Sequence, residues 1–399
     1  MPMSFRRRAA SMLRAGTLAS TLLLWGQAAR SAEPPLVLAK SGWIYVGGHV
    51  VTVAGKQYMV GQMYAEYMIP AKQLHPYPVI MVHGGTMSGT NYTGTPDGRE
   101  GWAQNFVRAG YAVYVVDQVG KGRSPYYPDI YGPNSQTDMS NNQSRYVAQE
   151  KAKLWPQAHL HTQWPGNNTL DDPAVQQLVS SQLPSIKDFH RQQELNTAGL
   201  IALVDKIGPS ILLVHSQAGA FVWPVADARP EAVRGILAIE PNGPPFYSVE
   251  YTGAPDWFRY SSDIALHYGI TDMPLTYAPA VKDASELKIV QEAKAEGPDL
   301  VRCYAQAEPA RQLPHLQKMP ILVITSEASY HAPYDHCTVN YLRQAGVKPS
   351  WIKLADRGIH GNSHVMMMEK NSREIADQII AWTNKAIRAK PPAKKTAAR

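Results

Sequence analysis

Hydrophobic and polar residues alternate along the chain just after residue 40. The alternation runs over residues 42–51 and again over residues 57–69, with Ala54 and Gly55 between the two stretches. A period of two is typical of strands that bury one face, and a short turn containing glycine joins antiparallel neighbours. The pattern predicts an antiparallel pair of strands at the start of a sheet.

A different pattern begins near residue 79. Six short apolar runs bounded by glycine, proline or charged residues are typical of strands buried on both faces: residues 79–82, 112–116, 211–214, 233–239, 321–325 and 351–354. Helical spacing separates several of them, over residues 100–109, 187–206 and 217–228. Asn371 and Glu374 have the spacing of a capping box for a final helix. The alternation predicts an α/β fold with a mostly parallel central sheet and helices on both faces.

Two long segments interrupt this rhythm. Residues of about 124–185 are rich in Pro, Gln, Asn and Trp, and residues of about 247–316 are rich in Tyr and Pro. Both follow predicted strands, so they are expected to lie over the carboxyl ends of the sheet, where loops select substrates. We predict that they are lid insertions within one catalytic domain, residues 33–388.

The two ends of the chain differ from this domain. Residues 1–32 hold five arginines, no acidic residue and an apolar stretch over residues 15–25, which predicts a signal peptide and a periplasmic or secreted protein. The apolar stretch is too short for a typical membrane-spanning helix, so no stable membrane insertion is expected once the signal is removed. Residues 389–399 predict a basic, disordered tail.

Charge excludes one class of partner, and the cysteines fit export. The net charge of the 399 residues is +7, but the first 32 residues carry +5 and the last 11 carry +4, which leaves −2 for the domain. Such a domain has no electrostatic footprint for nucleic acid. An oxidising compartment permits a disulfide between Cys303 and Cys337, which spacing alone does not establish.

Candidate chemistry starts at Ser216, directly after the apolar run 211–214. A serine hydroxyl becomes nucleophilic when a base takes its proton and a tight strand-to-helix turn exposes it. The usual pattern is Gly-x-Ser-x-Gly, whereas this chain has Val214 and Ala218 at the glycine positions and Gly219 one residue later. The turn is interpreted as a nucleophile elbow, with an ordinary strand-to-helix connection as the alternative.

An activated serine also needs donors for the oxyanion. The turn His83-Gly84-Gly85 follows the run 79–82 and leaves backbone N–H groups free, so the Gly85 amide is the first candidate donor. The Gln217 amide is the second, because the residue after the nucleophile lies at the positive end of the following helix.

The base and its acid have several candidates. His364 and His360 both lie between the last predicted strand and the final helix, and His364 is favoured because it is closer to that helix. Glu240 follows the run 233–239, while Glu327 and Asp335 follow the next strand, and either strand end can supply the acid. His159 and His161 are not interpreted as metal ligands because no third ligand lies near at a useful spacing.

The order of these residues resembles the α/β-hydrolase fold over residues 42–388. Within that fold the chain resembles a bacterial esterase subgroup with related fungal proteins, through the motifs at residues 95–99, 162–165, 215–217 and 361–367. The resemblance implies a glutamate as the triad acid, which matches Glu240, and it favours His364. It departs at Gly85-Thr86, where the subgroup's esterase has paired cysteines.

The sequence therefore predicts an exported serine carboxylesterase that cleaves a small-molecule ester through an acyl-enzyme. Ser216, His364 and Glu240 are the expected nucleophile, base and acid, and Gly85 and Gln217 the oxyanion donors. Neither a metal nor an organic cofactor is expected. An amidase or a lactonase would use the same residues, and a non-catalytic exported binding protein would keep the fold.

Overall fold

A computed structural model of the chain describes residues 33–387. The predicted signal peptide, residues 1–32, and the predicted basic tail, residues 389–399, lie outside the described residues. The expected antiparallel pair is present as β1 (Leu38–Val53) and β2 (Lys56–Pro70), joined by the turn at Ala54 and Gly55. No helix in the described part of the chain is long and apolar enough to cross a membrane.

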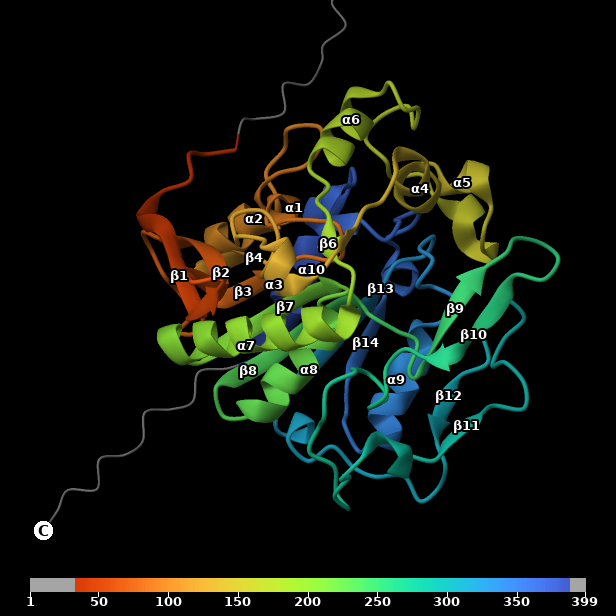
Figure 1. The fold of residues 1–399 in the computed structure, drawn as a ribbon. Helices are drawn as coiled ribbons and strands as arrows, with labels where there is room; N and C mark the ends of the chain where they lie inside the picture. The colour runs from red at the N-terminus through yellow and green to blue at the C-terminus, as the bar shows by residue number, and fades with distance from the viewer. Residues whose placement is uncertain (1–32, 388–399) are drawn as a thin grey trace, which may run out of the picture. The chain divides into compact units, whose positions relative to one another are not determined.

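The centre of the fold is an eight-stranded sheet in the order β1-β2-β4-β3-β7-β8-β13-β14 (Figure 1). The strands after β2 are β3 (Val79–Val82), β4 (Val113–Asp117), β7 (Ser210–Ser216), β8 (Val233–Pro241), β13 (Ile321–Thr325) and β14 (Ser350–Lys353). β2 runs antiparallel to β4, and every later pair in the sheet is parallel. The prediction of a mostly parallel sheet is confirmed.

Helices cover both faces of the sheet. The helices that connect or follow its strands are α2 (Trp102–Arg108), α7 (Phe189–Ile207), α8 (Gly219–Ala228), α9 (Asp335–Gln344) and α10 (Ser372–Ala386). α7 packs against α8, and α2 packs against α10 (Figure 1). Ile80 and Val82 of β3 belong to the core under α7 and α8, whereas Val79 and Met81 alternate to the other face.

The two segments that interrupt the sequence pattern hold only short elements. The first contains α3 (Pro128–Tyr131), β5 (Asn134–Ser135), α4 (Met139–Asn142), a π-helical turn η1 (Gln143–Val147), α5 (Gln149–Ala152), η2 (Pro156–Leu160), α6 (Pro173–Ser180) and β6 (Ser185–Ile186). The second contains β9 (Tyr247–Tyr251), β10 (Phe258–Ile264), η3 (Ala284–Glu286), β11 (Ile289–Gln291), β12 (Tyr304–Gln306) and η4 (Leu316–Lys318). The remaining short elements are α1 (Thr90–Thr93), η5 (Leu354–Arg357) and η6 (Met366–Met368).

Several sequence expectations differ from the structure. The capping box was wrong, because the Asn371 side chain makes no cap and instead exchanges hydrogen bonds with Asn362. α8 begins at Gly219 and not at Gln217, which leaves the turn itself outside the helix. Helix α9 was not predicted, and Cys337 within it forms a disulfide with Cys303 of the second segment.

Candidate active site

The turn after β7 holds Ser216 in a strained backbone conformation. Its φ is +54°, in the left-handed region that residues with a Cβ rarely adopt. The Asn242 amide donates to the Ser216 carbonyl at 2.8 Å and fixes the turn against the end of β8. A Cβ on Gly219 would lie 2.6 Å from the side chain of Pro241, the last residue of β8, so position 219 requires a glycine. The shifted glycine therefore has the role of closing this elbow.

The glycine turn after β3 lies directly beside Ser216. A Cβ on Gly84 would meet the Ser216 Cβ at 2.9 Å and the His215 Nδ1 at 3.0 Å. Among the hydrogen bonds of residues 33–387, neither the Gly85 amide nor the Gln217 amide donates to a protein acceptor. Both candidate oxyanion donors thus have free backbone N–H groups near Ser216.

We expect Gly84→Ala to disturb this contact, because its added methyl group would overlap the Ser216 Cβ and crowd the His215 ring. The expected destabilisation is about 1–3 kcal/mol, the usual cost of overpacking. Gly85→Ala is the matched control for stability, since its Cβ would meet only the Gln217 side chain, at 3.5 Å. Thermal unfolding of both variants checks the difference, and equal melting temperatures would contradict it.

A buried lysine lies next to the proposed oxyanion turn, the turn of residues 83–86 that follows β3. The Lys121 side chain, in the turn after β4, donates to the Gln217 side-chain oxygen at 3.4 Å. Burial lowers the pKa of Lys121 to about 7.

The Thr86 hydroxyl donates to Gln182, and the Leu183 amide donates to the Thr86 carbonyl at 2.6 Å. The end of the first insertion therefore anchors the oxyanion turn.

Glu240 and His364 form a buried pair at the carboxyl edge of the sheet. The His364 Nδ1 lies 2.6 Å from the Glu240 Oε2, and both side chains are almost wholly buried. Glu240 also accepts hydrogen bonds from the Ser326 amide at 2.8 Å and from the hydroxyls of Ser326 and Ser329 at 2.5 and 2.6 Å. Like Ser216, Glu240 has a positive φ, +42°. Burial raises the pKa of Glu240, and these donors and the nearby His331 oppose that rise.

The electrostatics around His364 favour a neutral imidazole. Burial lowers the pKa of His364 well below its usual range, and His331 and Arg145 lower it further. The His364 Nε2 is buried and has no hydrogen-bond partner among the described residues. With Nδ1 donating to Glu240, the lone pair on Nε2 is available to accept a proton.

Each rival residue has a different partner. The exposed His360 lies 3.1 Å from the Glu327 Oε1, and Glu327 also accepts from the Gly361 amide. Asp335 lies 2.8 Å from the His331 Nδ1 and accepts from Thr325. Neither rival carboxylate hydrogen-bonds to His364.

Sequence reasoning missed the aromatic residues that surround the base. The His364 ring has centroid distances of 4.5 Å to Tyr330, 4.5 Å to His331, 5.9 Å to Tyr146 and 4.3 Å to His215. Tyr330 also interacts with Ser216, which opposes the rise that burial gives to the Tyr330 pKa. The available signal was the position of residues 326–331 directly after β13, at the sheet edge that carries the other candidates.

Two groups of side chains have the proximity of metal ligands, namely Glu240, His331 and His364, and Cys303, His336 and Cys337. In the first group the His364 Nδ1 is bonded to Glu240, and the two nitrogens of His331 face Asp335 and Tyr334. In the second group the two sulfurs form the disulfide. Both nitrogens of His331 and both sulfurs are thus engaged within the protein, whereas the His364 Nε2 and the His336 Nδ1 have no hydrogen-bond partner among the described residues.

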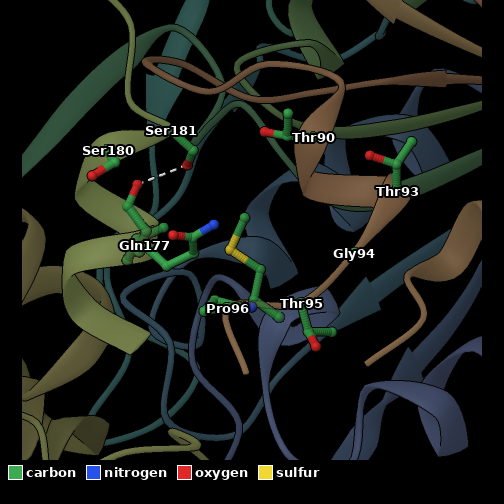
Figure 2. A pocket seen from close by; sticks show the side chains of 10 residues that line it. Thr90, Thr93, Gly94, Thr95, Pro96, Gln177, Ser180 and Ser181 are labelled. Atoms are coloured by element: carbon green, nitrogen blue, oxygen red, sulfur yellow. Dashed lines mark hydrogen bonds between the residues drawn. The ribbon is translucent and has the colours of Figure 1, made fainter. Parts of the chain in front are cut away.

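One hollow near the end of the loop that carries His364 belongs to a different part of the fold. A cavity of about 290 Å³ lies between α1, α6 and η6 (Figure 2). Threonines, Gln177 and two serines supply its polar lining, and Met368 adds an apolar wall. None of the candidate catalytic side chains lines it. A smaller cavity, of about 240 Å³, is lined by Gln217, which follows Ser216 in the chain, and by Asn242, whose amide binds the Ser216 carbonyl. Ser216, Glu240 and His364 are not among its lining residues.

A solved structure described as that of a novel bacterial esterase shares this architecture. It matches with a TM-score of 0.58 at 22% identity, covering 89% of this chain and 98% of that chain. The match and the strand order show that the chain has the α/β-hydrolase fold, as the sequence predicted. No family model matches the chain.

Sequence similarity extends this result to a family. A probable secreted lipase, phiG, from Fungal sp. (strain ATCC 74256) is 41% identical over 347 residues, which make up 86% of this chain and 90% of the relative. The chain belongs to the same hydrolase family as this fungal lipase. The resemblance to bacterial esterases and related fungal proteins is confirmed at the level of fold and family.

Proposed function

We propose that the protein is an exported serine carboxylesterase that works through an acyl-enzyme. The observation that carries this proposal is the buried Glu240–His364 hydrogen bond of 2.6 Å beside the Ser216 elbow. The family relationship to a probable secreted lipase supports both ester hydrolysis and export. The apolar, arginine-rich residues 1–32 would provide the export signal.

In the proposed mechanism, the Ser216 Oγ attacks the ester carbonyl carbon while His364 Nε2 takes its proton. The carbonyl oxygen becomes an oxyanion, which the free Gly85 and Gln217 amides would stabilise. Glu240 stabilises the imidazolium that forms. The imidazolium then protonates the leaving alcohol as the carbon–oxygen bond breaks. Water deacylates Ser216 by the same sequence, with His364 again acting as base.

The cavity beside the turn that holds Ser216 supports a small ester as substrate. The cavity of about 240 Å³ combines the polar Gln217 and Asn242 with apolar side chains that include Phe189, Pro244 and Leu266. Tyr146 of the first insertion and Tyr330 cover the His364 ring. We propose that the two insertions, residues 124–185 and 247–316, act as lids that limit the size of the acyl and alcohol groups.

An active-site phosphonate tests this function directly. A fluorophosphonate should label the protein, and peptide mapping should place the label on Ser216, because the reagent mimics the attacked carbonyl and needs an activated serine. Label on another residue would exclude Ser216 as the nucleophile, and the absence of any label would favour a binding protein. A parallel panel of esters, amides and lactones with equal acyl groups then separates the esterase from an amidase or a lactonase.

A further inference from the structure

His161 occupies a buried position that the proposed mechanism does not use. It follows η2 in the first insertion, and its side chain is fully buried between two carboxylates. The His161 Nε2 lies 2.8 Å from the Glu369 Oε1, and the His161 Nδ1 lies 3.2 Å from the Glu150 Oε2. An imidazole can donate from both nitrogens only when it is protonated.

The Glu369 carboxylate organises the loop that carries His364. It is fully buried and accepts hydrogen bonds from the Ser363 amide at 3.0 Å and from the Asn362 side chain at 2.7 Å. Ser363 immediately precedes His364, and its carbonyl accepts a bond from the Ser326 hydroxyl that also binds Glu240. Glu369 therefore holds the backbone from which the base projects.

Backbone bonds tie the same insertion to the same loop. The Thr162 amide donates to the Gly361 carbonyl at 3.0 Å, and the Lys370 amide donates to the Gln163 carbonyl at 2.9 Å. The segment that begins at His161 is thus bonded to both ends of the loop from Gly361 to Lys370. A change in His161 is transmitted to this loop through direct contacts.

The other charged groups near this pair have different partners. Arg99 donates to the backbone carbonyls of Glu369 and Lys370 and is paired with Asp97. The Lys370 ammonium donates to the Thr162 carbonyl. Among the described residues, His161 is therefore the cationic side chain that hydrogen-bonds the Glu369 carboxylate.

The protonation of His161 depends on these two carboxylates. Burial by itself would lower the pKa of His161, but the hydrogen bonds and charges of Glu150 and Glu369 outweigh it and raise the pKa to about 9. An unfolded histidine has a pKa of about 6.5. The stabilisation from the bridge is therefore fully present below about pH 6.5 and is lost as the pH rises through about 9.

We propose that His161 is a positioning residue for His364, which as an imidazolium bridges Glu150 and Glu369 and so orders the loop that carries the base. The proposal rests on the proposed function, because it takes His364 as that base. When His161 is neutral it can donate to only one carboxylate. The other loses its donor, and the loop from Gly361 to His364 loosens.

The test measures the rate at which a fluorophosphonate labels Ser216 in the secreted, full-length enzyme from pH 6 to pH 10. In the wild type the rate should fall on the alkaline side near pH 9. His161→Gln should lower the rate at neutral pH by about tenfold to a hundredfold, as for a misplaced catalytic group, and should abolish the alkaline fall. His159→Gln, an exposed neighbour on the same segment, should behave like the wild type.

A second variant decides the matter even if His161→Gln does not fold. Glu150 is partly exposed, and Glu150→Gln removes one of the two charges that raise the His161 pKa. Its alkaline fall should move to lower pH while the rate at pH 6 stays near that of the wild type. An unmoved fall, or an unchanged rate and profile in His161→Gln, would overturn the proposal. Failure of the proposed function can be told apart from failure of this inference, because the label would then be absent from Ser216 in the wild type.

Discussion

Ser216→Ala should lower ester hydrolysis by about 10⁴-fold or more, because a methyl group cannot form the acyl-enzyme. The loss should appear in kcat, with little change in KM, since the alanine leaves the shape of the surrounding site intact. Hydrolysis of a short-chain aryl ester, followed with purified secreted protein, measures it. Serine and alanine both carry a Cβ and are equally strained at the positive φ of this position, so the variant should fold like the wild type.

The control for Ser216→Ala is Ser180→Ala, at an exposed serine on α6 that lines the cavity of Figure 2. It should keep the wild-type rate. Phosphonate labelling of both variants adds a second reading, in which only Ser216→Ala loses the label. Wild-type hydrolysis by Ser216→Ala would show that another group carries the reaction.

Glu240→Gln should give the second-largest effect, a fall in kcat of about 10³- to 10⁴-fold. The carboxylate lies 2.6 Å from the His364 Nδ1 and is the charge that we propose stabilises the imidazolium. A glutamine keeps the size of the side chain but removes that charge. Steady-state kinetics on the same aryl ester, with circular dichroism to confirm folding, checks the prediction.

The matched controls are Glu327→Gln and Asp335→Asn, which remove the two rival carboxylates. Glu327 holds the exposed His360, so its loss should change kcat by less than about tenfold. Asp335 holds His331, whose ring stacks 4.5 Å from the His364 ring, so Asp335→Asn should act mainly on stability. A larger loss of turnover in either control than in Glu240→Gln would move the acid to the end of β13.

The sheet was predictable because its strands are short and buried on both faces. Residues 79–82 and 321–325 coincide with β3 and β13, since uninterrupted apolar runs with polar boundaries leave no ambiguity. Helix α9 was missed because buried polar residues, including Asp335 and Thr338, hide its helical period. Hydrogen bonds of these buried polar groups, such as that from Thr325 to Asp335, help to hold that helix in place.

The candidate site was predictable only in its order along the chain. Parallel strands bring their carboxyl ends to one edge, so the sequence placed Glu240, Glu327 and Asp335 in the same region. The pairing of each carboxylate with one histidine depends on differences of a few ångströms that no sequence pattern encodes. The Tyr330 contact with Ser216 and the buried His161 bridge depend on loop conformation in the same way.

The left-handed backbone conformation at Ser216 and Glu240 lowers stability at the two residues that the proposed mechanism needs. A non-glycine residue in a sparsely populated conformation costs about 1–3 kcal/mol, and this chain accepts that cost at both positions. Glycine would relieve the strain at either residue, but it would remove the proposed nucleophile or the proposed acid. Substitution by glycine, which would be the simplest way to raise the stability of these two turns, is therefore incompatible with the proposed activity. Higher thermal stability has to come from changes in the helices and insertions around them.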